Sequence, residues 1–393
     1  MILTQCAVCA TDLGLSLGKK CGRCSTRYCG PECQVQHWKE GGHDQLCKKI
    51  KKGGGAEQYH ADKKFKEVVA VAVEQCADDT KSQTCYICTQ ALHWKTKEGL
   101  VRGCSCRGTA GLVHVSCLVE QAKILVAEAE ENNLHDKAFY EKWRRWFTCS
   151  LCKQEYHGIV RCALGWACWK TYLGRPETDW ARRLAMTQLG GALTGAGHHE
   201  DALVVKEATL AMMRRVGSLE SDILAVQNNL ANAYRMVGRT EQALQMRQDI
   251  YSGYVKLLGK EHERTIRSAH NYVNLLLDLR RIEEAKSLLT KTIPVAQRVF
   301  GACNDTTLRM RMNYATTLYG DPTATLDDIR KAVTTLEEIE KTARRVFGGA
   351  HPTVAQVEGS LQYARDTLCD REMQSAAPPS PEDEPDALDD VTV

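Results

Sequence analysis

The stretch CSCRGTAGLVHVSCL, residues 104–118, is dense in side chains that bind metal. Its potential ligands are Cys104, Cys106, His114 and Cys117. Two pairs flank the stretch, and they are Cys85, Cys88, Cys149 and Cys152. A structural zinc ion takes four thiolate or imidazole ligands, so these eight residues predict two closed zinc sites. Between the sites the chain must reverse, and we expect Gly108 and Gly111 to adopt backbone angles that other residues resist.

A second group of ligands lies upstream, in residues 6–47. Its members are Cys6, Cys9, Cys21, Cys24, Cys29, Cys33, His43 and Cys47. They predict two more zinc sites, each of which contributes folding free energy on the order of 10 kcal/mol to a segment with little apolar core. His37 lies nearby without ligand spacing, and we expect it to pack or to cap. The sequence therefore predicts four Zn²⁺ ions in all.

Composition limits the class of protein. The chain has 393 residues, of which 43% are hydrophobic, and this suffices for two or three domains with a real core. A net charge of +3 gives no reason to expect nucleic-acid binding. The apolar runs at 68–73 and 159–169 are too short, or too charged, to span a bilayer. Paired cysteines without an evident export signal predict a soluble intracellular protein, cytoplasmic or nuclear.

The cysteine-rich part gives way to a helical repeat after about residue 170. Similar segments place Ala202, Ala243 and Ala285 at steps of 41 and 42 residues. Independently, Asn229, Asn271 and Asn313 recur at steps of 42. Each unit is typical of a helix pair, and the glycines that should end the second helices are Gly259, Gly301 and Gly348. A longer turn is expected near GDPTAT, and Pro294 should interrupt or kink its helix.

The upstream ligand group resembles a MYND zinc finger, in CAVC, CGRCSTRYCGPECQVQHW and HDQLC. The resemblance covers all eight ligand positions. It implies interleaved sites, with Cys6, Cys9, Cys29 and Cys33 on one zinc and Cys21, Cys24, His43 and Cys47 on the other. It also implies that the finger binds proline-containing peptides of partner proteins, although a metal-stapled fold without a partner is the alternative.

The second group has a ligand order shared by RING-CH and PHD fingers. Its C-x-C pair and the seven residues before His114 resemble RING-CH, because PHD fingers use a wider pair and a shorter gap. PHD fingers also tend to carry a tryptophan two residues before the last pair, where this chain has Phe147. The resemblance implies one zinc on Cys85, Cys88, His114 and Cys117 and another on Cys104, Cys106, Cys149 and Cys152. The 31 residues between Cys117 and Cys149 exceed the usual gap, and we expect one or two helices there.

RING-CH domains are ubiquitin ligases that hold a charged ubiquitin-conjugating enzyme and form no covalent intermediate. By position, the resemblance implies that Ile87 contacts the conjugating enzyme and that Lys153 contacts ubiquitin. All sixteen predicted ligands are used in closed sites, so no zinc has a position for a catalytic water. The alternatives to these contacts are that Ile87 packs under the finger and that Lys153 is an ordinary solvated lysine.

The helical part resembles tetratricopeptide repeats of the 42-residue form found in kinesin light chains, closest in GKEHERT and GGAHPTV. The resemblance covers residues 180 to 370, some four units and a terminal helix. It implies an extended groove that binds partner proteins, and a scaffold spacer is the alternative. The cysteines outside the ligand groups have no ligand spacing, although Cys162 and Cys168 could form an extra metal site.

The expected architecture is mainly α, with small zinc-stapled fingers followed by an α-solenoid of helix pairs. The expected segments are a MYND finger, 1–50; a linker and short helix, 51–80; a RING-CH finger with a helical insertion, 81–158; a connecting helix, 159–180; tetratricopeptide repeats, 181–372; and a disordered acidic tail, 373–393. The favoured function is a RING-CH ubiquitin ligase whose repeats and MYND finger bind substrate or partner proteins. The rival is a non-catalytic adaptor. A lysine methyltransferase would need a catalytic domain for which the chain has no room.

Overall fold

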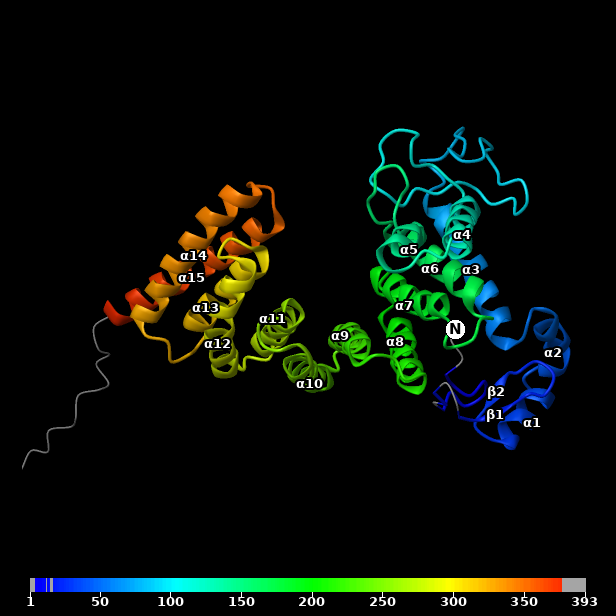
Figure 1. Ribbon diagram of the computed structural model, residues 1–393, viewed down its shortest axis with the longest axis horizontal. Helices are drawn as coiled ribbons and strands as arrows, with labels where there is room; N and C mark the ends of the chain where they lie inside the picture. Colours follow the sequence, from blue (N-terminus) through cyan, green and yellow to red (C-terminus); the bar gives the residue numbers. More distant parts are fainter. Residues whose placement is uncertain (1–3, 12, 15–16, 377–393) are drawn as a thin grey trace, which may run out of the picture. The chain divides into compact units, whose positions relative to one another are not determined.

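A computed structural model describes residues 4–11, 13–14 and 17–376 (Figure 1). The chain divides into two compact units, Met1–Ala243 and Leu244–Val393. The elements, in chain order, are β1 Lys19–Lys20, β2 Arg27–Tyr28, α1 Pro31–Lys39, α2 His43–Lys52, α3 Ala56–Gln75, α4 Val115–Glu131, α5 Asp136–Trp143, the short 3-10 helix η1 Arg144–Trp146, α6 Gly158–Tyr172, α7 Trp180–Gly195, α8 His199–Arg215, α9 Glu220–Met236, α10 Thr240–Leu258, α11 Glu263–Asp278, α12 Ile282–Phe300, α13 Asp305–Tyr319, α14 Leu326–Phe347 and α15 Pro352–Ala376.

The first ligand group forms a small module of its own at the start of the first unit. Strands β1 and β2 pair antiparallel, with Lys19 opposite Tyr28, and α1 and α2 follow. Apart from the cysteines, its buried apolar side chains are few, chiefly Leu13, Tyr28 and Ile50. So small a core contributes little to stability, and the module depends on metal for its folding free energy.

Helix α6 lies at the centre of the first unit. Its buried residues occupy every side of the helix, including Val160, Leu164, Trp166 and Trp169. A helix that is apolar all round must be covered all round. Helices α3, α4 and α7 pack against it (Figure 1). The buried core therefore runs without a break from the second ligand group, through α6, into α8.

The 31 residues between Cys117 and Cys149 are helical, as the sequence predicts. They form most of α4, all of α5 and η1. The rings of Trp143 and Trp146 are buried, and their centroids lie 5.3 and 5.9 Å from that of Tyr172 in α6. This insertion thus attaches the second ligand group to the central helix.

Helices α6 and α7 approach closely at Gly165. A Cβ atom built on Gly165 would lie 2.5 Å from the Cβ of Ala192, closer than real Cβ atoms come. Gly191, also in α7, has open space at the same position. Glycine at 165 is therefore required by packing, whereas glycine at 191 is not.

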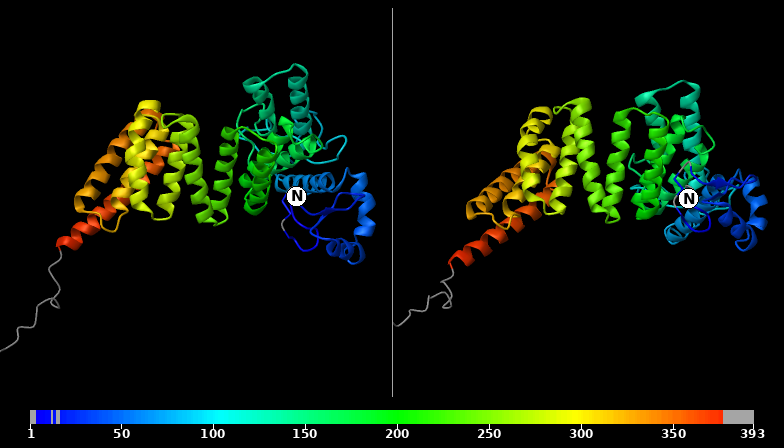
Figure 2. Two further views of the ribbon diagram at one scale, coloured as in Figure 1. Left: turned by 60° about the horizontal axis from the view of Figure 1, so that its bottom comes forward. Right: turned by 90° about the horizontal axis from the view of Figure 1, so that it is seen from below.

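The helical repeat has the predicted form. In the first unit α7 packs against α8, and in the second α11 packs against α12 and α13 against α14, with α15 after them. In the second unit, α11 to α15 pack in sequence, as Figure 2 also shows. The repeat alanines are fully or almost fully buried, in keeping with closely packed helices.

The helix ends of the repeat also follow the sequence. Gly259, Gly301 and Gly348 have φ of 81°, 91° and 81°, the left-handed region that favours glycine at a helix end. Pro294 does not interrupt its helix, because α12 continues through it. The longer turn at GDPTAT leads into α14, where Thr325 and Asp328 form a capping box.

Two further expectations concern the ends and the membrane. Within the described residues, no helix is long and apolar enough to cross a bilayer. The acidic tail was predicted to be disordered from residue 373, but α15 continues to Ala376. The remainder of that predicted tail, 377–393, lies outside the described residues.

We expect Gly165→Ala and Gly191→Ala to shift stability in opposite directions. In an open helical position, alanine stabilises by about 0.5–1 kcal/mol relative to glycine. Gly191→Ala should show this gain. Gly165→Ala should instead destabilise by about 1–3 kcal/mol, because the new methyl group overpacks the α6–α7 contact. Urea unfolding followed by circular dichroism measures both, and equal midpoints for the two variants would contradict the close approach.

Candidate metal centres

The first module brings its eight potential ligands together as two tetrads. One consists of Cys6, Cys9, Cys29 and Cys33, and the other of Cys21, Cys24, His43 and Cys47. In each tetrad all ligand atoms lie within 4.8 Å of one another. The first tetrad has Sγ–Sγ distances of 3.4, 3.5 and 3.7 Å among Cys9, Cys29 and Cys33. The grouping is the interleaved one that the MYND resemblance implies.

The second ligand group also forms two tetrads. They are Cys85, Cys88, His114 and Cys117, and Cys104, Cys106, Cys149 and Cys152. The His114 Nδ1 atom lies 3.3 Å from the Cys88 Sγ and 3.7 Å from the Cys117 Sγ. The Sγ atoms of Cys106 and Cys149 are 3.7 Å apart. The four sulfur atoms of the second tetrad thus come from two segments more than forty residues apart in sequence, roughly the gap that α4 and α5 fill.

The distances fit zinc. In a tetrahedral site with Zn–S of about 2.3 Å and Zn–N of about 2.0–2.1 Å, neighbouring sulfurs lie about 3.8 Å apart, and a sulfur and a nitrogen about 3.5 Å. The Sγ–Sγ distance between Cys21 and Cys47 is 3.8 Å, and the Cys24 Sγ lies 3.5 Å from the His43 Nε2. Disulfide bonds are absent among the described cysteines, which leaves each thiol able to ligate.

The histidine of the second group is held in the orientation of a ligand. While Nδ1 of His114 faces the cysteines, Nε2 lies 3.3 Å from the carbonyl oxygen of Ala91. A hydrogen bond from the far nitrogen fixes the tautomer that a metal needs. In the first module His37 joins neither tetrad. Its Nδ1 lies 3.0 Å from the Tyr28 hydroxyl, and its ring packs against that of His43, so it packs as expected.

The thiols of the tetrads have pKa values shifted in both directions. Burial raises the pKa of the Cys104 and Cys117 thiols well above the usual range. The contact with Cys29 raises the pKa of Cys33 to about 12, whereas the hydrogen bond from Thr11 lowers that of Cys9 to about 6. Without a metal, the thiols of one tetrad therefore do not all ionise together. A divalent cation balances their charge, and its binding releases protons.

All four C-x2-C pairs fold into the same knuckle. In the knuckles that begin at Cys6, Cys21, Cys85 and Cys149, the cysteine amide donates to the carbonyl five residues on. Its carbonyl accepts from the amide four residues on. The residue at that fourth position has a left-handed backbone each time, at Ala10, Ser25, Thr89 and Lys153. The cysteine spacing, together with this single turn, positions two thiols on one metal.

The loop between the sites of the second group reverses as expected, for two different reasons. Gly108 has φ of 62°, the left-handed value for which glycine was predicted. Gly111 does not have a positive φ, so the expectation of an unusual backbone angle was wrong there. A Cβ atom at Gly111 would instead lie 2.7 Å from the Cβ of Cys106, which excludes any side chain beside this ligand.

Ile87 and Lys153 both lie on knuckles. The Ile87 side chain is 37% exposed, and its amide donates to the Cys85 Sγ over 3.4 Å. Lys153 is exposed, and its ammonium donates to the carbonyl of Ser150 at 2.5 Å. The ammonium therefore folds back onto its own knuckle in this structure.

Leu151 is an exposed residue that the sequence reasoning missed. In the knuckle that begins at Cys149 it occupies the position that Ile87 occupies in the knuckle that begins at Cys85. The Leu151 side chain is 47% exposed, and its amide donates to the Cys149 Sγ over 3.4 Å. The two knuckles touch, because the Tyr86 hydroxyl lies 3.2 Å from the Ser150 hydroxyl. The signal was present as a large aliphatic residue before the second cysteine in both CYIC and CSLC.

The remaining cysteines hold no metal site among the described residues. Cys76, Cys162 and Cys168 are buried, and Cys303 and Cys369 are exposed. Burial raises the pKa of Cys168 far above its usual range, as expected for a thiol in an apolar core. Neither Cys162 nor Cys168 belongs to a group of potential ligands, so the suggested extra site is not formed.

We expect the purified chain to contain four zinc ions. Cys104→Ser should lower the count and unfold the second ligand group, because a tetrad without one thiolate loses most of its affinity. Cys303→Ser is the matched control, since it removes an exposed cysteine outside the tetrads and should leave four. Elemental analysis measures both variants, and two zinc ions in the unaltered chain would contradict the second pair of sites.

Comparison with protein families agrees with this division of the chain. Models of three families match, namely the MYND finger over residues 6–47, the RING-variant domain over 85–134 and the tetratricopeptide repeat over 222–298. The RING-variant match ends before Cys149 and Cys152, whose tetrad partners Cys104 and Cys106 lie within it. No curated protein matches the chain.

Solved structures with chains similar to part of this one include a protein with TPR-like repeats. A putative kinesin light chain from Podosopora anserina with nearly identical TPR-like repeats is 19% identical, with a TM-score of 0.42, over 49% of this chain and 90% of that one. BtubC (BKLC) from P. vanneervenii is 14% identical, with a TM-score of 0.40, over 71% of this chain and 99% of that one.

These findings describe a chain of three kinds of module. The RING-variant domain is consistent with a RING-type ubiquitin ligase, and tetratricopeptide repeats imply protein partners. The chain carries a MYND finger, a RING-variant domain and tetratricopeptide repeats, and its four tetrads are consistent with four zinc ions.

Proposed function

We propose that the chain is a RING-type ubiquitin ligase that binds a charged ubiquitin-conjugating enzyme on its RING-variant domain. The observation that carries the proposal is the exposed apolar pair Ile87 and Leu151, which lies on two knuckles joined by the Tyr86–Ser150 contact. A small interface needs a few central apolar anchors on a rigid support. Zinc and the knuckle hydrogen bonds supply that support.

The proposed mechanism uses proximity alone. Each zinc would be surrounded by four protein ligands, so none could activate water or a nucleophile. The domain would hold the conjugating enzyme while a bound partner presents its acceptor lysine, and the gain in rate would come from orientation. The tetratricopeptide repeats and the MYND finger would bind that partner.

A non-catalytic adaptor remains the second candidate, and one observation favours it. Lys153, which would contact ubiquitin, instead donates to the Ser150 carbonyl. In the ligase this ammonium would have to leave the knuckle when ubiquitin arrives. An adaptor would need no such movement.

Replacing Ile87 with alanine tests the docking surface. The loss of a central anchor should cost about 1–3 kcal/mol of docking. Ubiquitin transfer should then fall roughly five- to hundredfold. Ile124→Ala is the matched control, because Ile124 is an exposed isoleucine on α4 and not part of a knuckle, and its loss should leave transfer unchanged. Autoubiquitination with a panel of conjugating enzymes measures the rates, and zinc content verifies the fold.

Two results would favour the adaptor. One is the absence of transfer by the unaltered chain with every conjugating enzyme of a broad panel. The other is robust transfer that Ile87→Ala leaves intact.

The role of Lys153 can be tested separately with Lys153→Thr. Threonine occupies the equivalent left-handed position of the Cys85 knuckle, at Thr89, so the knuckle should still form. If Lys153 contacts ubiquitin, transfer should fall severalfold while binding of the conjugating enzyme without ubiquitin stays the same. Equal transfer by both proteins would assign Lys153 to the solvated surface.

A further inference from the structure

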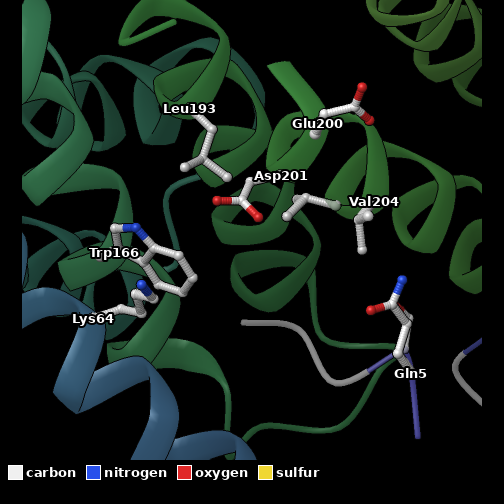
Figure 3. A pocket seen from close by; sticks show the side chains of 9 residues that line it. Gln5, Lys64, Trp166, Leu193, Glu200, Asp201 and Val204 are labelled. Atoms are coloured by element: carbon white, nitrogen blue, oxygen red, sulfur yellow. The ribbon is translucent and has the colours of Figure 1, made fainter. Parts of the chain in front are cut away.

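Helix α6 carries two tryptophans that line different cavities of the first unit. Figure 3 shows Trp166 in one of them, near Leu193 and the Asp201 carboxylate. The acidic residues of that cavity, Glu200 and Asp201, lie in the first turn of α8, where the helix dipole favours negative charge. Their position therefore has an explanation without a ligand. The cavity at Trp169 differs, because it gathers hydrogen-bond donors.

The cavity at Trp169 has a volume of about 120 Å³ and is built by segments far apart in sequence. Its lining residues are Lys20 of β1, Glu57 of α3, Trp169 of α6, Glu177 of the loop between α6 and α7, Arg182 and Met186 of α7, and Met212 of α8. Pockets for whole small molecules typically have about 300–1,000 Å³. This cavity therefore suits a polar group of a few heavy atoms and not a drug-sized molecule.

The indole of Trp169 supplies the first donor. Trp169 is 2% exposed, and its Nε1 atom is buried without a hydrogen-bond partner among the described residues. A buried donor that lacks an acceptor costs free energy. Because the ring lines the cavity, a ligand that accepts a hydrogen bond there would recover this cost.

Arg182 supplies a second donor, and its guanidinium is held in place. The Nη1 atom donates to the carbonyl oxygen of Arg175 at 2.5 Å, and the guanidinium carbon lies 5.9 Å from the centroid of the Trp169 ring. The Nε atom of Arg182 is buried and, like the indole nitrogen, has no partner in the described part of the chain. Two unpartnered N–H groups thus belong to neighbouring side chains of fixed orientation, and such preorganisation favours binding.

The charge of the lining favours an anion. Lys20 and Arg182 form no ion pair within the residues that the structure describes. Glu177 is a lining carboxylate, but the Arg215 guanidinium donates to both of its oxygens, at 2.8 and 2.7 Å. Glu57, in the first turn of α3, is the remaining carboxylate. Two cations therefore face one carboxylate, and a ligand with a single negative charge would balance them.

We propose that this cavity binds a carboxylate group. Its oxygens would accept from the Trp169 indole and from Nε of Arg182, and they would pair with the Lys20 ammonium. A carboxylate has acceptors only, so it can satisfy all of these donors at once. Phosphate, with up to two charges, would be repelled more strongly by Glu57. The carboxylate would belong to a small organic acid or to an acidic side chain of a bound protein. The proposal does not rest on ligase activity.

The indole N–H itself reports on the site by NMR of the isotope-labelled, zinc-loaded full chain. Sodium acetate should move the Trp169 indole proton signal downfield and reach saturation, because the proton gains a charge-assisted hydrogen bond. Trp146 is the matched control. Its Nε1 atom is also buried and without a partner among the described residues, but Trp146 does not line the cavity, so its signal should stay. Spectra of Trp169→Phe and Trp146→Phe assign the two signals, and sodium chloride at equal ionic strength corrects for salt.

Two substitutions in the lining should change the acetate affinity in opposite directions. Lys20→Gln removes a cation and should weaken acetate binding severalfold, whereas Glu57→Gln removes the competing carboxylate and should strengthen it severalfold. Lys19→Gln is the matched control, because Lys19 precedes Lys20 in β1 and does not line the cavity. Elemental analysis for zinc verifies that each variant keeps its metal sites, since Lys20 adjoins the ligand Cys21.

A peptide distinguishes the two sources of the carboxylate. If acetyl-Gly-Glu-Gly-amide shifts the Trp169 signal at least as effectively as acetate, the cavity accepts an acidic side chain of a protein. If acetate shifts the signal and the peptide does not, the ligand is a small organic acid.

Three results would overturn the proposal. The first is a Trp169 signal that acetate moves no further than sodium chloride does, which would leave the donors to water. The second is equal acetate affinity of Lys20→Gln and Glu57→Gln. The third is tighter binding of sodium phosphate than of acetate, which would indicate a site for a dianion. Because no ubiquitin or conjugating enzyme is present, none of these results bears on the ligase proposal.

Discussion

A helix that is apolar on every side can exist in water only when other elements cover it completely, and this constraint organises the first unit. Helix α6 carries Val160, Leu164, Trp166 and Trp169 around its circumference. Its cover comes from α3 before the RING-variant domain, from α4 within it, and from α7 after it. The RING-variant domain and the helices α6 to α8 are therefore not separate modules joined by a linker. They share one core, so a change at a contact with α6 affects the packing of both.

Zinc binding stabilises some parts of the chain, and apolar packing stabilises others. The MYND finger has few buried apolar residues beyond its own ligands, so its fold depends on metal. The second unit is built from stacked helices whose core, including Leu336, Ile339 and Val357, contains no potential zinc tetrad among the described residues. The RING-variant domain combines both, since its tetrads are continuous with the core around α6.

The sequence predicted the parts of the structure that depend on local spacing. Cysteine pairs separated by two residues predict knuckles, and the 42-residue period predicts helix pairs, because both signals can be read along the sequence. The central position of α6 could not be predicted in this way. An apolar run shows that a segment is buried, but it does not show which segments cover it. For the same reason the close approach of Gly165 to Ala192 could not be predicted, since α6 and α7 meet only in the folded chain.

The shared core also sets the geometry of any reaction that the chain assists. The knuckles with Ile87 and Leu151 belong to the same compact unit as the helices α7 and α8, and α6 packs against both α4 and α7. Two ligands held on one stiff body meet at a high effective concentration when their lengths match the span, and hardly at all when they do not. A partner bound on α7 and α8 would thus present to the knuckles only the part of its surface that lies at this fixed distance. The residue of the partner that reacts would then be chosen by where it lies on the partner's surface, and not by its chemical surroundings.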